Sequence, residues 1–290
     1  MKTTRREFIQ GIGALTVAAS LKVASVRAAE GGNAVTPAIN PVYLTGSVEH
    51  WPLAELASMG YRGLEITPDC LDRMSAWKPA ADKAGLGAVC VNAMPELRPY
   101  LTGSLSDGVE RRRRATLDKL LQTLKHMRDE GISFLVVAPS RLAENYQSPD
   151  QARALLVLGL RELASAGDST ILLGAAPFRL FASSGEIAGI VDEVALPNVG
   201  AALDVGHALL GGENPAAAAK NLGPRLRYVQ VHDADVRPGL PLLDRHLPLG
   251  QGTATKEDIR AAVGSLPCSV GITPVAEPLS AARTAIQWVG

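Results

Sequence analysis

The sequence predicts a single-domain α/β fold, a closed (β/α)8 barrel, and three observations support this prediction. Short apolar, β-branched segments alternate with amphipathic or alanine-rich helical patterns, and eight such units follow one another. Their combined span of roughly 250 residues is typical of one barrel with a large core. In addition, two apolar runs between residues 198 and 235 end abruptly in aspartate and histidine. Strands of a barrel end in this way at its mouth, where the carboxyl ends of parallel strands meet.

Eight continuous apolar runs are the expected strands, because strands buried on both faces carry few polar residues. They lie at residues 39–44, 63–67, 87–91, 133–138, 170–175, 199–203, 227–232 and 269–275. An open, doubly wound sheet is the alternative arrangement of such units. No GxGxxG motif follows the first run, which counts against a dinucleotide-binding version of that alternative.

The expected helices repeat apolar residues three and four positions apart or are rich in alanine. They lie at residues 52–59, 75–84, 108–130, 150–166, 184–194, 215–222, 256–263 and 280–289. Gly85, Gly131 and Gly167 stand where helices should end. Glycine adopts the left-handed conformation of a helix C-terminus without steric cost, so each is expected to act as a stop.

The first residues are expected to lie outside the barrel. TRREFIQ places Arg5 and Arg6 ahead of a mildly apolar, Gly/Ala-rich run, and it resembles a twin-arginine (Tat) export signal. A membrane anchor is the alternative, but the run is too short to span about 30 Å of hydrocarbon and is interrupted by Lys22. We therefore expect a periplasmic or otherwise exported protein with no stable membrane insertion. The expected parts are a signal at residues 1–28, a loose leader at 29–37 and the barrel at 38–290.

The composition is that of an ordinary globular protein with a small-molecule partner. Of the residues, 47% are hydrophobic, and 29 basic side chains balance 29 acidic ones. This balance leaves no electrostatic surface for nucleic acid. Cys70, Cys90 and Cys268 are far apart and odd in number, so we expect buried thiols rather than a disulfide framework or a CxxC metal site.

Polar residues follow the sixth and seventh expected strands, where they would converge at one rim. Asp204 and His207 follow the sixth strand, and His232, Asp233 and Asp235 follow the seventh. A bland interpretation stays open: Asp204 and His207 can cap the next helix and hold a loop, and His232 can be a satisfied core histidine.

Three further features have two interpretations each. Glu65, at the end of the second strand, is either a carboxylate that binds a ligand hydroxyl or a partner for Arg62 or another cation. His246 lies in a long loop after the seventh strand, at residues 235–253, and either contacts a ligand or is exposed. The four arginines at 111–114 are either the solvated start of an amphipathic helix or a phosphate clamp, with residues 92–107 as a lid.

Four segments together resemble the xylose-isomerase-like TIM barrels, the sugar isomerases and epimerases that also include inosose dehydratases and endonuclease IV. They are GYRGLEI at 60–66, LDVGH at 203–207, VHDAD at 231–235 and HLPLGQG at 246–252. The resemblance extends from about residue 39 to the end. It implies a small carbohydrate or polyol partner and a divalent metal, Mn²⁺, Mg²⁺ or similar, at the mouth of the barrel.

The resemblance also assigns roles to individual residues. It implies that Asp204 and His232 bind the metal and that His207 contacts substrate. We expect His207 and Glu65 to be the catalytic residues. Asp235 and His246 are further candidates for substrate binding. The family's two remaining metal ligands are glutamates, and here their positions carry Ala176 and Thr273.

The loss of these glutamates leaves a thin ligand set, since a hard dication prefers several oxygen ligands. The sequence therefore predicts weak metal binding, with Glu277 and Asp233 as candidate replacement ligands. The loss of both glutamates also removes the carboxylate pair that the resemblance implies for moving a proton between adjacent carbons.

Two functions thus remain open from the sequence. One is an exported sugar or polyol isomerase, epimerase or related lyase. The other is a non-catalytic descendant that binds a carbohydrate-like ligand. A DNA-repair endonuclease is disfavoured by five histidines, zero net charge and the export signal.

Overall fold

The computed structural model describes residues 37–40, 51–94, 103–140, 147–273 and 276–290. All of them belong to one compact unit, residues 34–290. The predicted export signal lies outside the described residues, as does the predicted leader apart from Pro37. Among the helices of these described segments, none is long and apolar enough to cross a membrane.

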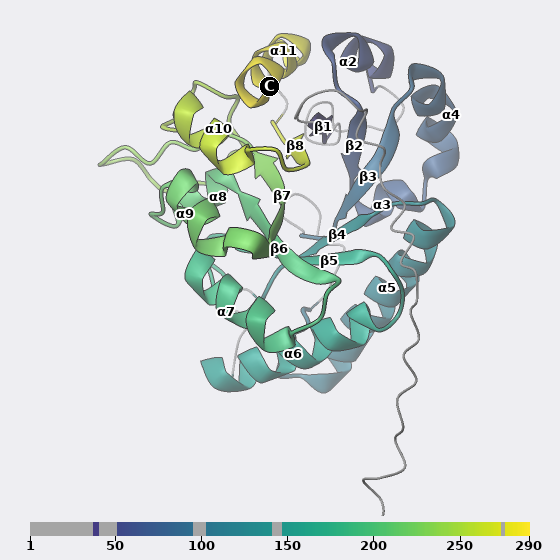
Figure 1. The fold of residues 1–290 in the computed structure, drawn as a ribbon, viewed down its shortest axis with the longest axis vertical. Coiled ribbons are helices and arrows are strands. Elements are labelled where there is room, and N and C mark those ends of the chain that lie inside the picture. The colour runs from purple at the N-terminus through teal and green to yellow at the C-terminus, as the bar shows by residue number, and fades with distance from the viewer. Residues whose placement is uncertain (1–36, 41–50, 95–102, 141–146, 274–275) are drawn as a thin grey trace, which may run out of the picture. The chain divides into compact units, whose positions relative to one another are not determined.

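Eight parallel strands close into one barrel in chain order, and β1 pairs with β8 to complete it. The strands are β1 Pro37–Ile39, β2 Gly63–Ile66, β3 Gly87–Asn92, β4 Phe134–Val137, β5 Thr170–Gly174, β6 Val199–Asp204, β7 Leu226–Val231 and β8 Cys268–Val270. Figure 1 shows the strands inside and the helices around them. The closure confirms the predicted single-domain (β/α)8 fold and excludes the open, doubly wound sheet.

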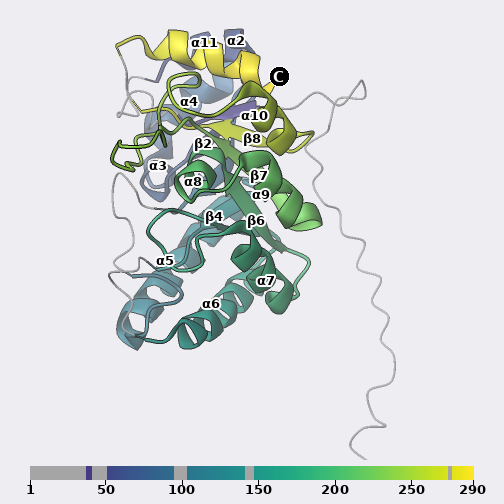
Figure 2. The same ribbon diagram turned by 90° about the vertical axis from the view of Figure 1, so that its left-hand side faces the viewer.

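Helices connect the strands on the outside of the barrel, as Figure 2 shows from the side. They are α2 Leu53–Met59, α3 Pro68–Leu71, α4 Met74–Ala84, α5 Glu110–Asp129, α6 Pro149–Ala164, α7 Ser184–Val194, α8 Val205–Leu210, α9 Pro215–Leu222, α10 Lys256–Val263 and α11 Pro278–Val289, with a 3-10 turn at Gly223–Arg225. The short helices α3 and α8 and the 3-10 turn are absent from the sequence prediction, because none of them is long enough to show a helical repeat.

The strands separate two apolar layers, because successive side chains point to opposite faces. On β4, Leu135 packs between the sheet and the helices, whereas Val136 packs inside the barrel. The interior layer consists of Cys90, Met94, Val136, Leu172, Ala202 and Tyr228. The interior of the barrel is thus filled by apolar side chains, and polar side chains gather near the carboxyl ends of the strands.

Several boundaries differ from the prediction. The first strand ends at Ile39, where the prediction had it begin, and the eighth ends at Val270. Gly85 caps α4 with φ 72°, as predicted, but α6 ends at Ala164 with Ser165 as its C-cap, and Gly167 takes no left-handed conformation. All three cysteines are free and buried, as predicted.

The arginine run at the start of α5 is paired with neighbouring groups. Arg112 Nε lies 2.8 Å from the Asp107 carboxylate, and Arg113 donates to the Asp107 carbonyl. Arg114 pairs with Glu162 at 2.9 Å. These contacts favour the interpretation as a solvated helix start over a phosphate clamp.

Candidate functional site

Three predicted site residues lie at the carboxyl ends of the neighbouring strands β6 and β7. Asp204 is the last residue of β6, His207 lies in the first turn of α8, and His232 directly follows β7. Asp204 Oδ1 also accepts a hydrogen bond from the His207 backbone N–H at 3.1 Å, which caps α8. Gly206 makes room for the imidazole, because a Cβ there would lie 2.0 Å from His232 Cε1. The LDVGH segment therefore combines a helix cap with a close approach to the next strand.

The loop between β7 and α10 brings Asp244 and His246 back to these residues. The buried Asp233 carboxylate holds the base of this loop. Four backbone N–H groups donate to it over 2.8 to 3.0 Å, those of Ala234, Gly250, Gly252 and Ala254. Asp233 also exchanges two backbone hydrogen bonds with Leu247. We call this arrangement of Asp233, Leu247 and the four N–H groups the loop clasp.

His246 next to the clasp has a left-handed φ of 46°. Such a conformation costs a non-glycine residue roughly 1 kcal/mol or more. The fold thus accepts local strain at this histidine, and strained backbone of this kind concentrates at functional sites.

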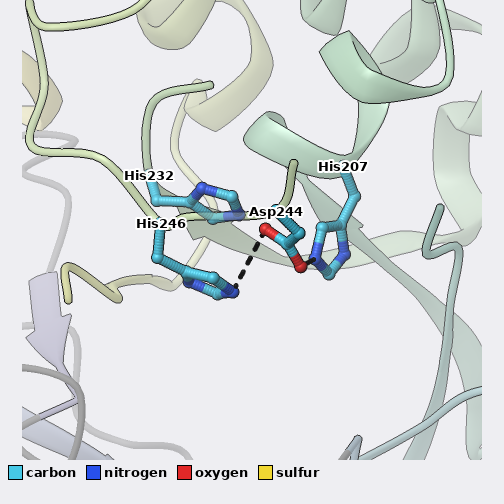
Figure 3. A group of neighbouring side chains, drawn as sticks. All are labelled: His207, His232, Asp244 and His246. Atoms are coloured by element: carbon cyan, nitrogen blue, oxygen red, sulfur yellow. Dashed lines mark hydrogen bonds and ion pairs between the residues drawn. The ribbon is translucent and has the colours of Figure 1, made fainter. Parts of the chain in front are cut away.

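Four side chains form a compact group, which we call the histidine cluster: His207, His232, Asp244 and His246. One possible ligand atom from each lies within 4.8 Å of the others. Asp244 lies between His207 and the two remaining imidazoles (Figure 3), with Oδ2 at 3.0 Å from His207 Nε2 and Oδ1 at 3.6 Å from His246 Nε2. The rings of His232 and His246 stack with centroids 3.8 Å apart. Three of the four residues are buried, and Asp244 is 17% exposed.

Each imidazole is oriented by a main-chain carbonyl behind it. Nδ1 lies 3.3 Å from the Ala175 oxygen in His207, 3.1 Å from the Asp233 oxygen in His232 and 3.0 Å from the Gly271 oxygen in His246. A carbonyl only accepts hydrogen bonds, so the contacts assign the proton to Nδ1 in all three rings. Nε2 then faces a carboxylate oxygen, at 2.8 Å from Asp204 in His232 and at 3.0 Å from Asp244 in His207. Since a carboxylate oxygen only accepts, a proton or a metal ion has to lie between it and Nε2.

The two carboxylates are ionised. Burial alone would raise the pKa of Asp204, but attraction to His207, His232 and His246 outweighs it and holds that pKa well below its usual value. For Asp244, burial is again opposed by the hydrogen bond and charge of His207, and its pKa is also lowered. Asp204 Oδ1 lies 2.8 Å from His232 Nε2. The cluster therefore presents imidazole nitrogens and carboxylate oxygens together.

This donor set suits a divalent transition metal. Imidazole nitrogens held from behind by carbonyl groups, together with a carboxylate, are typical ligands of Zn²⁺ and similar ions. Mg²⁺ and Ca²⁺ prefer sites built from oxygen alone. The residues present thus fit a metal, and they favour a nitrogen-seeking ion over the Mg²⁺ named in the sequence prediction.

Glu65 lies deeper in the barrel, in a polar layer formed by Asn40, Glu65, Asn92, Gln230 and Ser269. Its oxygens accept hydrogen bonds from all four neighbours, at 3.0 Å from Asn40, 3.2 Å from Asn92, 2.9 Å from Gln230 and 2.7 Å from Ser269. Burial raises the pKa of Glu65, and these hydrogen bonds oppose the rise. The suggested partner Arg62 instead donates to the backbone oxygens of Ala57 and Tyr61. That interpretation of Glu65 is therefore wrong, because amides and a hydroxyl satisfy the carboxylate.

Asp235 lies at the start of the β7–α10 loop and pairs with Arg237. Arg237 Nε is 2.8 Å and its NH2 group 2.5 Å from the two carboxylate oxygens. The hydrogen bond from Arg237 lowers the pKa of Asp235 to about 2. Its role in substrate binding stays a prediction.

The two positions at which the resemblance predicts glutamates lie beyond strands β5 and β8. Ala176 is buried two residues after β5. Thr273 Oγ1 donates to the Arg245 carbonyl at 2.8 Å, and its N–H donates to the His246 carbonyl at 3.0 Å. Glu277 is exposed at the start of α11, outside the histidine cluster. Neither candidate replacement ligand belongs to this cluster, since the Asp233 carboxylate holds the loop clasp; the cluster contains Asp244 and His246 instead.

Asp244 is the residue that the sequence prediction missed. Its loop is brought to the cluster by long-range contacts of the Asp233 carboxylate, so no local pattern in the sequence marks it. The prediction also left His246 between a ligand contact and an exposed residue. It is 6% exposed, so it is not a surface histidine.

Comparison with known proteins agrees with the barrel fold described above. Residues 53–289 match the model of the family described as xylose isomerase-like TIM barrel. A search of curated protein sequences finds no match.

Three solved structures illustrate the similarity of the fold. The apo form of 3-keto-D-glucoside 4-epimerase, YcjR, from E. coli is 18% identical, with a TM-score of 0.69 over 88% of this chain and 99% of that one. D-psicose 3-epimerase with D-tagatose from Clostridium cellulolyticum H10 is 15% identical, with a TM-score of 0.70 over 88% and 98%. IOLI protein with a binding zinc atom is 19% identical, with a TM-score of 0.66 over 88% and 95%. At such identities the similarity establishes the fold of the chain.

Proposed function

The chain belongs to the xylose isomerase-like TIM barrel family, and we propose that it is a metal-dependent isomerase, epimerase or related lyase of a small sugar or polyol. The reaction takes place at the carboxyl end of the barrel. Two of the similar structures are described as sugar epimerases, and one is described with a binding zinc atom. These descriptions support the substrate class and the metal.

The histidine cluster is the observation that carries the proposal. Three imidazoles and a carboxylate converge within 4.8 Å, and all three rings are oriented by carbonyl groups. This ligand set compensates for the two absent glutamates, since Asp244 and His246 bring new donor atoms from the β7–α10 loop. The sequence predicted weak metal binding; we propose instead that the cluster binds Zn²⁺ or a similar ion.

We assign the metal to His232, Asp244 and His246 because a catalytic site keeps an open ligand position. The rings of His232 and His246 stack directly, whereas the centroid of His207 lies 5.4 and 5.8 Å from theirs, across Asp244 (Figure 3). A metal held by these residues would supply Lewis acidity toward a carbonyl or hydroxyl oxygen of the substrate. His207 Nε2, next to Asp244, accepts and returns the proton.

The test is proton exchange at carbon. Purified protein is loaded with zinc, its metal content is measured, and it is incubated with D-fructose, D-tagatose or D-psicose in heavy water. Loss of a carbon-bound proton signal in NMR is expected with the original protein and at least about 100-fold slower loss with His207→Gln, since general acid–base catalysis contributes about 10²- to 10⁴-fold.

His126→Gln is the matched control. His126 lies on α5 with 53% of its side chain exposed, so its loss should change neither metal content nor exchange. Exchange that is unaffected by His207→Gln would refute the assigned role, and protein that binds no stoichiometric metal would refute the metal centre.

A non-catalytic, carbohydrate-binding protein is the second candidate. The observation that favours it is the absence of a carboxylate at Ala176 and Thr273, together with the complete hydrogen bonding of Glu65. Binding of a sugar without any carbon-bound proton exchange would decide for this candidate.

We further propose that residues 1–28 direct export by the twin-arginine route and that the protein works in the periplasm or beyond. The support is the TRREFIQ segment with Arg5 and Arg6 ahead of a weakly apolar run. A neutral net charge agrees with a small-molecule partner rather than nucleic acid.

A further inference from the structure

A small cavity joins the histidine cluster to the polar layer inside the barrel. It is lined by Glu65, Asn92, Gln230 and Ser269 on the side of the polar layer and by His232 and His246 on the side of the cluster. A ligand atom that extends from the cluster into the barrel would enter this cavity. The polar groups that line it therefore decide which ligand atoms are accepted.

Glu65 fixes the orientation of the Gln230 side chain. Gln230 Nε2 donates to Glu65 Oε2 at 2.9 Å. The reversed amide would place its oxygen against the carboxylate oxygen, and two acceptors in contact repel each other. The Gln230 Oε1 atom must therefore point away from Glu65.

This oxygen has no hydrogen-bond donor among the described residues, although Gln230 is only 4% exposed. The residues beside it in the sheet register are Asp204 on β6 and Ser269 on β8. Asp204 is an acceptor, and the hydroxyl of Ser269 already donates to Glu65 at 2.7 Å. Buried acceptors are normally satisfied, so a donor from outside the protein is expected at this oxygen.

We infer that Gln230 is a specificity-determining residue whose Oε1 accepts a hydrogen bond from a hydroxyl group of the ligand, with Glu65 as the positioning residue that holds the amide. The inference rests on the proposed function, and it narrows the substrate class. The group that enters the cavity is a neutral hydroxyl. A phosphate or carboxylate would meet the amide oxygen and the carboxylates of Glu65 and Asp204, and like charges repel strongly where water is excluded.

The test compares sugars with their deoxy analogues. Dissociation constants of D-fructose and D-tagatose, and of the analogues that lack one hydroxyl each, are measured by titration calorimetry on the zinc-loaded protein. One analogue should bind roughly tenfold or more weakly than its parent, because it leaves the Gln230 oxygen without a donor. Gln230→Met keeps the length of the side chain and removes the acceptor, so it should bind this parent and analogue equally.

Two further variants test whether Glu65 positions the Gln230 amide or only stabilises the fold. Gln122→Met, at an exposed position on α5, should retain the full discrimination. Glu65→Gln frees the Gln230 amide to rotate, so discrimination in the folded protein should fall toward equality while zinc content is retained. The thermal unfolding temperature should fall as well, because Glu65 is a buried charged acceptor of four hydrogen bonds. A merely structural role of Glu65 would lower stability and leave the discrimination of the folded fraction unchanged.

The outcomes separate this inference from the proposed function. If the sugars bind and Gln230→Met discriminates as the original protein does, the inference is wrong and the proposed function stands. If no sugar binds the zinc-loaded protein, both are wrong. Should Gln230→Met fail to fold, a crystal structure of the original protein with D-tagatose decides: a sugar hydroxyl within hydrogen-bond distance of the Gln230 amide supports the inference, and a bound sugar that makes no contact with Gln230 overturns it.

Discussion

The residues of the candidate site serve the fold and the chemistry at the same time. Asp204 ends β6, caps α8 through the His207 N–H and lies 2.8 Å from His232 Nε2. The bland interpretation of this residue as a helix cap and its interpretation as part of a site are therefore both consistent with the structure. A substitution of Asp204 would disturb the helix cap and the site together, so its effect could not be assigned to either role. Other residues give clearer tests.

His246 offers a cleaner test at the scale of one residue. Its φ of 46° is tolerated by asparagine better than by most residues. His246→Asn should keep the backbone and fold but lower zinc affinity by roughly tenfold or more, since even outer-shell changes at metal sites cost about 10- to 100-fold. His246→Ala should lower zinc affinity equally and also destabilise the protein, because alanine is strained at positive φ.

Zinc titration and urea unfolding of both variants measure these effects. His126→Asn on the exposed face of α5 is the control, and it should leave zinc affinity unchanged. Equal zinc affinity in His246→Asn and the original protein would remove His246 from the ligand set.

Single residues also show the limit of prediction from sequence. Asp204 and His232 were predictable as neighbours, because each follows an apolar run and parallel strands end at one rim. Asp244 was not, since the return of its loop depends on the Asp233 carboxylate and on four N–H groups up to 21 residues away. A long-range contact of this kind leaves no periodic signal in the sequence.

At the scale of an element, the β7–α10 loop depends on its clasp. Asp233→Asn replaces a charged acceptor of four N–H hydrogen bonds with an amide that has one oxygen and an NH2 group facing the same donors. We expect a loss of about 3 kcal/mol in the free energy of unfolding, since hydrogen bonds to charged groups contribute about 1.5 to 3 kcal/mol each. Urea unfolding measures the loss, and hydrogen exchange should quicken at Gly250, Gly252 and Ala254.

Asp235→Asn is the matched substitution in the same loop. Asp235 pairs with Arg237, whose side chain is 66% exposed, and exposed ion pairs contribute only about 0 to 1 kcal/mol. If both variants lost the same stability, the clasp would not be the main anchor of the loop.

Strand and helix positions followed from the sequence where the apolar runs are long. The five-residue strand Thr170–Gly174 and the helix Ser184–Val194 agree closely with the predicted 170–175 and 184–194. The short helix α8 was not predicted, because its six residues are too few for a helical repeat and its start is fixed by the Asp204 cap. Strand β1 was placed too late in the chain, since its three residues gain their partners only from β2 and β8.

The closed barrel links the two ends of the described chain. Pro37–Ile39 pairs with Cys268–Val270, so the sheet is complete only when the last strand has been made. The histidine cluster likewise joins α8, the end of β7 and the following loop. Folding and assembly of the site therefore require almost the entire chain. An export route that accepts folded proteins would allow both to finish before transport.

The last prediction concerns this route. Arg5→Lys with Arg6→Lys keeps the positive charge and removes the twin arginines, which are read by a receptor as an address. The precursor should then stay in the cytoplasm in a folded, protease-resistant form, because the barrel itself is unchanged. Cell fractionation with immunodetection measures this. Arg111→Lys with Arg128→Lys on α5 is the control with equal charge, and it should be exported normally. Periplasmic accumulation of the Arg5/Arg6 variant at the level of the control would contradict the twin-arginine route.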